Sequence, residues 1–379
     1  MIPIRILCAV FVACALDVTL AQETNRDAVA LLASDHPRTL SDKTLLERAK
    51  GLSDNEEDKL RAQLETDPGD IETRMVLIFR ELPDLRRQRG KRSDPKPHGK
   101  LVLGLIEQHP RSPLAGTAGL MLYPYKRDGM YTGPAWNEAI ELWERLAAKN
   151  PKDPAIASNA GLFLIADPFL LSRGGARALV LLQRARKLAP SEPRWALNLG
   201  SYHAMGRAVT RDPEERAAHA KAGLPHLRAA WDLSDPSKRG DLDVMNEPLP
   251  MTLADAYHDV GDAQSARTFA TLALDSEDPK EPRGGVVYGM NALLGRIALA
   301  QGDVDGAVRF LQKAGKTPGS PSLGSFGPDL TLAKELLSSG KRAAVLEFLT
   351  SCKVFWHSGQ DRLTSMILSI KGGGDPWND

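Results

Sequence analysis

Three segments in the C-terminal half of the chain repeat one pattern without gaps, and this repetition constrains the fold more than any other feature. Each segment starts with a Leu followed by a small residue, has a Gly eight positions after that Leu, and carries apolar residues 13, 17 and 20 positions after it. The leading residues are Leu253, Leu294 and Leu332. Agreement at so many positions indicates one structural unit that is copied along the chain.

The spacing within each copy predicts two antiparallel helices. The leading Leu and the residues one and four positions later share one face of a first helix, and the later apolar residues share one face of a second helix. The intervening glycines, Gly261, Gly302 and Gly340, are predicted to end the first helix with positive φ, which is favourable without a Cβ. An Ala there should cost on the order of 1 kcal/mol, and least at Gly340 in the last copy. Because no segment alternates with a period of two, we expect almost no β-structure.

Less regular copies precede these segments. The pattern around Ala139 and Trp143 recurs 39 positions later around Ala178 and Leu182, and each copy ends at a Pro that cannot continue a helix. A first helix is predicted to follow each Pro, and the loops inside these two hairpins are predicted to be long, near residues 167–175 and 206–215. Further helices are predicted over residues 41–50, 56–66, 71–82, 98–109, 114–122 and 362–370.

This pattern resembles the tetratricopeptide repeat family, which pairs Leu-Gly and an aromatic residue on a first helix with Ala, an aromatic residue, Ala and Pro on a second. The matching residues are Leu199-Gly200, Leu253-Ala254 with Tyr257, Leu294-Gly295, Ala139-Trp143-Pro151, and Ala178-Leu182-Ala185-Pro190. The units here are 38 to 41 residues apart, whereas the family's repeat is about 34 residues long. The resemblance implies an all-α fold, an α-solenoid in which antiparallel helical hairpins form a right-handed superhelix. It also implies a concave surface, lined by the first helices, that binds a peptide or a protein.

The first residues have the order of an export signal. Met1–Arg5 carry one positive charge, residues 6–16 are apolar, and small residues at Thr19 and Ala21 precede Gln22. We therefore expect cleavage between Ala21 and Gln22 and a periplasmic or secreted protein, with lipoprotein processing at Cys14 as the alternative. The apolar run is too short to span a membrane. The expected division of the chain is a signal peptide (1–21), an N-terminal extension (22–52), divergent hairpins (53–129), repeats (130–352), a capping helix (353–370) and a disordered tail (371–379).

Composition and motifs exclude several classes of function. The chain has 49 basic and 48 acidic residues, a balance that does not favour binding to nucleic acid or to a membrane surface. Once the signal peptide is removed, Cys352 is the remaining cysteine, which cannot form an internal disulfide. No spacing typical of a catalytic, cofactor-binding or metal-binding motif occurs in the sequence. We therefore expect no catalytic residues, no cofactor and no metal site.

Equivalent positions of the predicted first helices supply candidate partner contacts. Asp255, Arg296 and Lys334 each follow their leading Leu by two positions. The resemblance implies that this column faces the concave surface, and an ordinary solvated surface is the alternative. It also matches Asn159 and Asn198 to an Asn of the family's groove for C-terminal carboxylates. Other residues replace the Lys positions of that groove, so the ligand is not carried over.

The remaining candidates are Arg194 and two irregular segments. Tyr125, Tyr131 and Trp136 cluster near two glycines and are either anchors for a partner or residues that pack against the next hairpin. The segment Arg86–Lys100 carries seven basic residues, and is either a docking patch for an acidic partner or a solvated loop.

These observations favour an exported scaffold that binds a protein or peptide through its first helices, and not an enzyme. The alternative is an enzyme, or an accessory subunit of an envelope enzyme complex, that uses the irregular region 80–135 or the long loops inside the hairpins. A cleft holding a titratable pair of shifted pKa in region 80–135 would favour the enzyme. A continuous surface of first helices would favour the scaffold.

Overall fold

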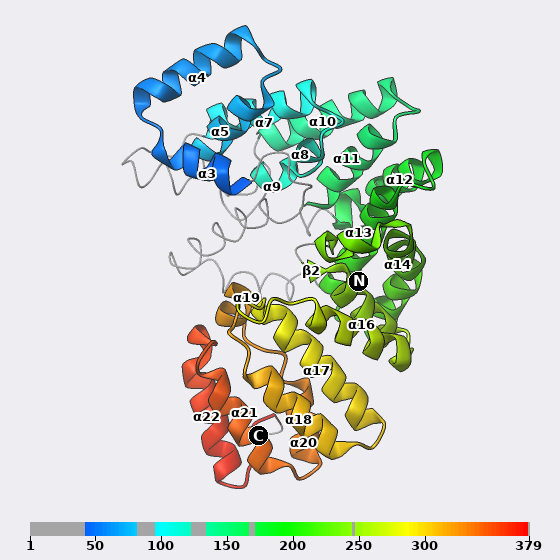
Figure 1. The fold of residues 1–379 in the computed structure, drawn as a ribbon, viewed down its shortest axis with the longest axis vertical. Helices are drawn as coiled ribbons and strands as arrows, with labels where there is room; N and C mark the ends of the chain where they lie inside the picture. Colours follow the sequence, from blue (N-terminus) through cyan, green and yellow to red (C-terminus); the bar gives the residue numbers. More distant parts are fainter. Residues whose placement is uncertain (1–41, 82–94, 123–133, 167–170, 245–246, 378–379) are drawn as a thin grey trace. The chain divides into compact units, whose positions relative to one another are not determined.

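The computed structural model describes residues 42–81, 95–122, 134–166, 171–244 and 247–377. Helices make up nearly all of the regular structure in these ranges (Figure 1). Two strands of two residues each, β1 (Asp243–Val244) and β2 (Glu247–Pro248), pair antiparallel. The predicted all-α fold with almost no β-structure is therefore confirmed. No described helix is both long and apolar enough to cross a membrane.

The chain forms two compact units, each with its own hydrophobic core. The first unit contains residues up to 215 together with 225–236, and the second contains 216–224 together with 237–379. The first unit holds α3 (Asp42–Gly51), α4 (Asp54–Thr66), α5 (Ile71–Arg80), α7 (Pro95–Gln108), α8 (Pro113–Gly116), α9 (Ala118–Leu122), α10 (Pro134–Lys149), α11 (Pro154–Ile165), α12 (Leu171–Leu188) and α13 (Pro193–Val209). Helix α14 (Pro213–Leu233) contributes residues to both units.

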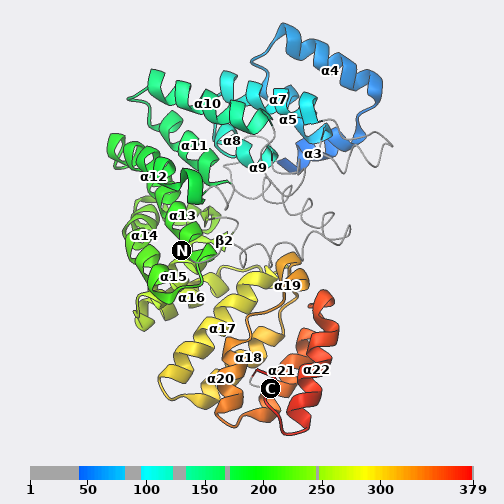
Figure 2. The same cartoon turned by 180° about the vertical axis from the view of Figure 1, so that it is seen from behind.

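Three helical hairpins follow one another in the second unit (Figures 1 and 2). They are α15 (Leu249–Asp259) with α16 (Ala263–Asp275), α17 (Gly284–Ala300) with α18 (Val304–Gly315), and α20 (Thr331–Ser338) with α21 (Arg342–Cys352). The remaining elements are η3 (Pro236–Asp241), α19 (Pro321–Ser325), η4 (His357–Gly359) and α22 (Gln360–Lys371), the last of which packs against α21. The three aligned segments of the sequence are thus three hairpins.

The glycine in each hairpin ends its first helix as predicted. Gly261, Gly302 and Gly340 have φ of 82°, 83° and 80°. In the first hairpin the Gly261 N–H donates to the His258 carbonyl at 3.0 Å, and the Asp262 N–H donates to the Tyr257 carbonyl at 2.9 Å. The other two hairpins repeat this pair of hydrogen bonds. This arrangement satisfies the last carbonyls of the helix, and it requires a left-handed residue at the glycine position.

Small residues lie where the helices of the two upstream hairpins cross. A Cβ on Gly200 would lie 2.5 Å from Leu227 Cδ2, and a Cβ on Gly161 would lie 2.7 Å from Leu182 Cγ. The first helix therefore brings its backbone directly against a Leu of the second helix. The repeat pattern is maintained by this close packing.

The loops inside the two upstream hairpins are shorter than the sequence predicts. Helix α12 begins at Leu171 and α13 extends to Val209, so residues 171–175 and 206–209 are helical. The connection between α13 and α14 consists of three residues, Thr210, Arg211 and Asp212. Helix α14 begins at Pro213, where a proline in the first turn costs nothing because its missing N–H would have no partner in the helix.

Helix α3 packs against α5 through a buried arginine. Arg80, at 4% exposure, donates from Nη1 to the Ala49 carbonyl at 3.0 Å and also to the carbonyl of Leu52. The positive charge meets the carbonyl end of α3, where the helix dipole favours a cation. The described part of the predicted N-terminal extension thus belongs to the first unit. The predicted signal peptide lies outside the described residues.

The C-terminal residues differ from the disordered tail that the sequence predicts. Arg342 donates from its guanidinium to the carbonyls of Ile370, Gly373 and Gly374 at 2.5 to 3.2 Å. Trp377 is half-buried against the core of the second unit. These contacts hold the segment after α22 against the last hairpin.

Candidate functional site

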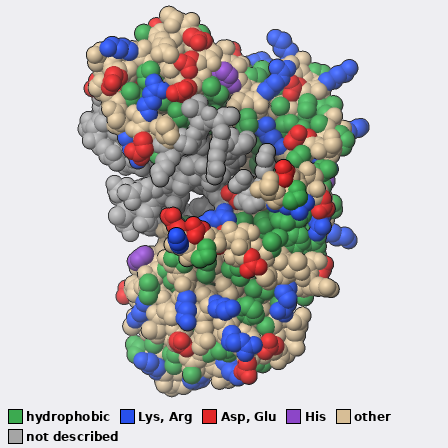
Figure 3. Space-filling view, viewed as in Figure 1, with side chains coloured by type: hydrophobic (Ala, Val, Ile, Leu, Met, Phe, Trp, Pro, Cys, Tyr) green, Lys and Arg blue, Asp and Glu red, His purple; other side chains and the backbone are tan. Residues whose placement is uncertain are grey.

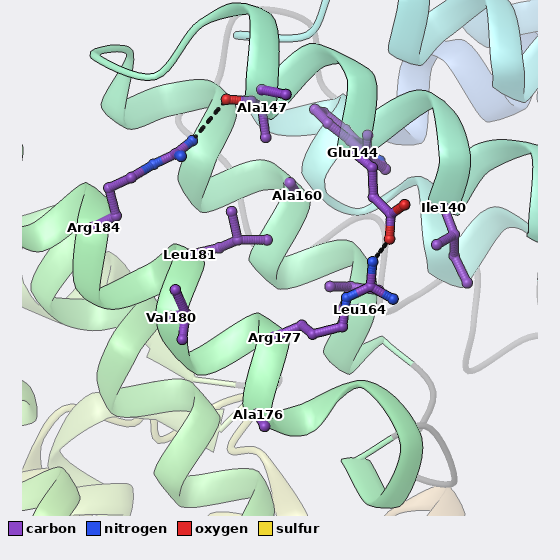
Figure 4. Close-up of a pocket in the computed structure, with 12 residues that line it drawn as sticks. Ile140, Glu144, Ala147, Ala160, Leu164, Ala176, Arg177, Val180, Leu181 and Arg184 are labelled. Atoms are coloured by element: carbon purple, nitrogen blue, oxygen red, sulfur yellow. Dashed lines mark hydrogen bonds and ion pairs between the residues drawn. The ribbon is translucent and has the colours of Figure 1, made fainter.

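An open apolar groove in the first unit is the best-formed candidate for a binding site. It lies between α10 and α12, above α11, and has a volume of about 570 Å³ (Figure 4). Its apolar lining includes Trp143, Ala147, Ala160, Leu164, Val180 and Leu181. Val180 is 64% exposed at the mouth of the groove. An exposed apolar side chain beside a hollow is typical of a surface that buries an apolar group of a partner.

The groove exists because small residues line it. Alanines at positions 147, 148, 160 and 176 leave space where longer side chains would join the two outer helices. Helix α11 packs closely on α12 and carries no charged residue. The floor is therefore apolar, and the two outer helices remain apart above it.

Two polar contacts cross the groove (Figure 4). Glu144 on α10 forms an ion pair with Arg177 on α12, and Arg184 Nη2 on α12 donates to the Ala147 carbonyl at 3.1 Å. On α10 the two contacts are made by Glu144 and Ala147, which are three residues or about 4.5 Å apart along the helix axis. On α12 they are made by Arg177 and Arg184, which are seven residues or about 10 Å apart. The opening between the two contacts has room for one or two side chains rather than for a whole helix.

The helices that build the groove carry more basic than acidic residues. Helix α12 carries five basic residues and no acidic residue, whereas α10 carries three acidic and two basic residues. With the uncharged α11, the three helices have a net charge of +4 in a chain whose net charge is +1. Two of the basic residues of α12, Arg177 and Arg184, line the groove itself.

Asn159 and Asn198 connect neighbouring repeats. Asn159 is fully buried and donates from Nδ2 to the carbonyls of Pro110 and Ser112 at 2.9 and 2.8 Å. Asn198 donates from Nδ2 to the Ser158 hydroxyl at 2.7 Å. These bonds use the amide donors within the repeat stack, so their geometry gives both residues a structural role.

Arg194 and Trp136 also contact other parts of the first unit. Arg194 donates to Asn159 Oδ1 at 3.2 Å and lies over the Trp195 ring. Burial lowers the pKa of Arg194, against the opposing effect of the Glu192 charge. Trp136 is 5% exposed and stacks on Phe163 with ring centroids 4.7 Å apart, which agrees with the packing alternative.

Several sequence candidates lie outside the described residues. Tyr125 and Tyr131 fall in residues 123–133, and most of the basic segment Arg86–Lys100 falls in residues 82–94. The remainder of that segment begins α7, in which Lys100 is exposed. The structure therefore leaves the docking patch for an acidic partner at this segment as a prediction.

The second unit brings two members of the predicted polar column together. Asp255 lies on α15 and Arg296 on α17, and both are half-buried. Burial lowers the pKa of His258 on α15, and the Arg296 charge lowers it further, whereas the charges of Asp259 and Asp255 raise it. Lys334 is exposed on α20.

Sequence reasoning missed the groove, although one signal was present. The groove depends on the separation of α10 from α12, which no local pattern encodes. The run of basic residues without an acidic residue over 171–188 was visible in the sequence. In the described parts of the chain, no group of three or more His, Cys, Asp or Glu side chains is arranged to hold a metal ion.

No model of a known protein family matches the chain, and no curated protein matches its sequence. Several solved structures are similar in fold, among them the following two. A thermophilic TPR protein of Thermus thermophilus is 19% identical over 55% of this chain and 91% of its own, with a TM-score of 0.31. The APC/C hetero-tetramer Cut9-Hcn1 is 14% identical over 86% of this chain, with a TM-score of 0.42, and this chain spans 54% of the matched chain.

The assignment of the fold rests on the hairpins themselves. The glycine cap recurs in the three hairpins of the second unit, and a close helix crossing at a glycine recurs in the two upstream hairpins of the first unit. The fold is tetratricopeptide-like. In such a fold each hairpin buries its apolar face against its neighbours, and the outer faces of the helices remain available.

Proposed function

We propose that this protein is a non-catalytic scaffold that holds a peptide or protein partner, with an apolar side chain of the partner inserted between α10 and α12. The observation that supports it is the open apolar groove, which has exposed Val180 at its mouth. Its volume of about 570 Å³ falls in the range of about 300–1,000 Å³ that is typical of binding sites. A buried apolar anchor surrounded by polar contacts is the usual centre of a binding surface.

Site-specific photo-crosslinking tests this proposal in the cells that produce the protein. A photoreactive phenylalanine replaces Val180, and in a control chain it replaces Val209, which is 51% exposed at the end of α13. We expect a discrete adduct with a second protein from position 180 and none from position 209. Equal adducts from both positions, or no adduct from position 180, would contradict the proposal.

The first helices of the second unit supply a second proposed contact surface. Asp255 and Arg296 lie close enough for their charges to affect the same histidine, and Lys334 occupies the equivalent place in the next hairpin. Arg296→Glu should weaken the binding of a partner that contacts this surface. An unchanged affinity would exclude this surface from the partner's binding site.

We also propose that the scaffold acts outside the cytoplasm. The charged, apolar and small-residue order of the first 21 residues supports this proposal. Mass spectrometry of the protein from its native cells should find Gln22 at the N-terminus. An intact Met1 or an acylated Cys14 would contradict cleavage at Ala21.

A further inference from the structure

We infer that the groove between α10 and α12 selects an acidic partner segment, in which an apolar anchor is flanked by Asp or Glu. This inference rests on the proposed function and adds the chemistry of the partner. Four residues of α12, Arg177, Val180, Arg184 and Lys187, are spaced by three, four and three positions and therefore share one helix face. The face presents an exposed apolar residue between basic ones.

The surface around this face is positive as well. The three helices that build the groove carry a net charge of +4, and α12 carries no acidic residue. Lys and Arg side chains gather along the edge where these helices lie (Figure 3). Complementary charge steers association and selects among partners.

The ion pair between Glu144 and Arg177 is weak enough for a carboxylate of the partner to replace Glu144 on Arg177. The side chains of Glu144 and Arg177 are 46% and 59% exposed, and an exposed pair of this kind contributes only about 0–1 kcal/mol. A carboxylate of the partner can therefore replace Glu144 on Arg177 at little cost. Glu141, another acidic residue of α10, pairs with Arg145 at 4.0 Å, and Arg145 balances its charge.

Arg184 is placed to bind a second carboxylate of the partner, at the end of the opening away from Arg177. Its Nη2 is occupied by the Ala147 carbonyl, and this contact keeps the guanidinium at the rim of the groove. An anchor next to Val180 would thus lie between two positive charges on α12. A segment with acidic residues on both sides of a Leu or Phe matches this order.

A random peptide library, displayed on phage and selected on purified residues 22–379, tests the inference. We expect enrichment of a large apolar residue flanked by Asp or Glu. For a selected peptide, Val180→Glu and Arg177→Glu should each weaken binding at least tenfold, and Glu144→Gln should strengthen it severalfold by freeing Arg177. The matched control is Arg228→Glu, because Arg228 is also an exposed, ion-paired arginine in the first unit. It should leave the affinity unchanged.

The outcomes separate the two claims. Peptides that lose binding with Val180→Glu but lack acidic residues, or that tolerate Arg177→Glu, would overturn the acidic partner and leave the scaffold standing. Peptides whose binding does not depend on Val180 would overturn both claims. Binding of anionic lipid vesicles that requires Arg177 and outcompetes every selected peptide would also overturn the acidic peptide partner.

Discussion

Glycine serves two purposes in the second unit, and replacement by Ala should cost different amounts in the two cases. Gly261 has a φ of 82°, and no atom lies within 4 Å of the place where a Cβ would be. Gly284 would place a Cβ 1.8 Å from the carbonyl oxygen of Gly319, a backbone atom that cannot rotate away. We expect Gly261→Ala to lower the free energy of unfolding by about 1 kcal/mol, and Gly284→Ala to lower it by about 3 kcal/mol. Urea denaturation measures both.

The substitution Gly261→Asn distinguishes the cost of a positive φ from the cost of steric crowding. Asn tolerates the left-handed conformation better than Ala does, so Gly261→Asn should cost less than Gly261→Ala. Equal losses for Asn and Ala would show that positive φ is not the reason for the glycine. Equal losses for Ala at both positions would contradict the steric account of Gly284.

At the scale of the element, the second helices of the hairpins differ in their N-terminal caps. Asp262 accepts a hydrogen bond from the Ser265 N–H at 2.9 Å, and Asp303 accepts one from the Gly306 N–H at 2.7 Å. Removal of such a cap should cost about 1 kcal/mol, so Asp262→Ala should destabilise the protein by that amount at pH 7. The Ser265 backbone and hydroxyl lower the pKa of Asp262 below its ordinary value of 3.8. The difference in the free energy of unfolding between the unmodified protein and the Asp262→Ala variant should therefore persist above pH 3.8. It should shrink as the pH falls through the lower folded-state pKa of Asp262.

Lys341 is the matched control for this cap. It occupies the same position before α21, and its side chain makes no cap hydrogen bond. Its ion pair with the largely exposed Asp305 spans 2.9 Å and should contribute little. Lys341→Ala should therefore change stability by less than about 0.5 kcal/mol. A loss at Lys341 that equals the loss at Asp262 would show that helix capping is not the cause. Thermal and urea unfolding at several pH values decide between these outcomes.

The hairpins could be predicted from sequence because their determinants are local. The helical spacing of the apolar residues and the turn glycine both act within one hairpin. The role of Asn159 could not be predicted, because it bonds to carbonyls 47 and 49 residues upstream. The groove could not be predicted either, since it depends on how far apart the packing of successive hairpins leaves α10 and α12. Local patterns specify the units of a solenoid, whereas contacts between units decide which surfaces remain open.

At the scale of the whole molecule, the division into two units predicts that damage remains local. In a repeat protein each hairpin contacts mainly its neighbours, so stability is close to a sum of local terms. Helix α14 contributes residues to both units. A destabilising substitution in one unit should therefore make local unfolding of that unit more frequent. It should leave the frequency of unfolding of the other unit nearly unchanged.

Cys352 provides a direct readout of opening in the second unit. Its side chain is fully buried, and burial raises the pKa of the thiol to about 12, so the folded protein should react very slowly with thiol reagents. In residues 22–379 it is also the one cysteine, which makes labelling specific to α21. Gly340→Ala, in the turn before α21, should accelerate labelling about fivefold if it costs about 1 kcal/mol. Gly200→Ala, at a helix crossing in the first unit, should leave the labelling rate unchanged although it lowers stability there. Equal acceleration by both substitutions would mean that the two units open together.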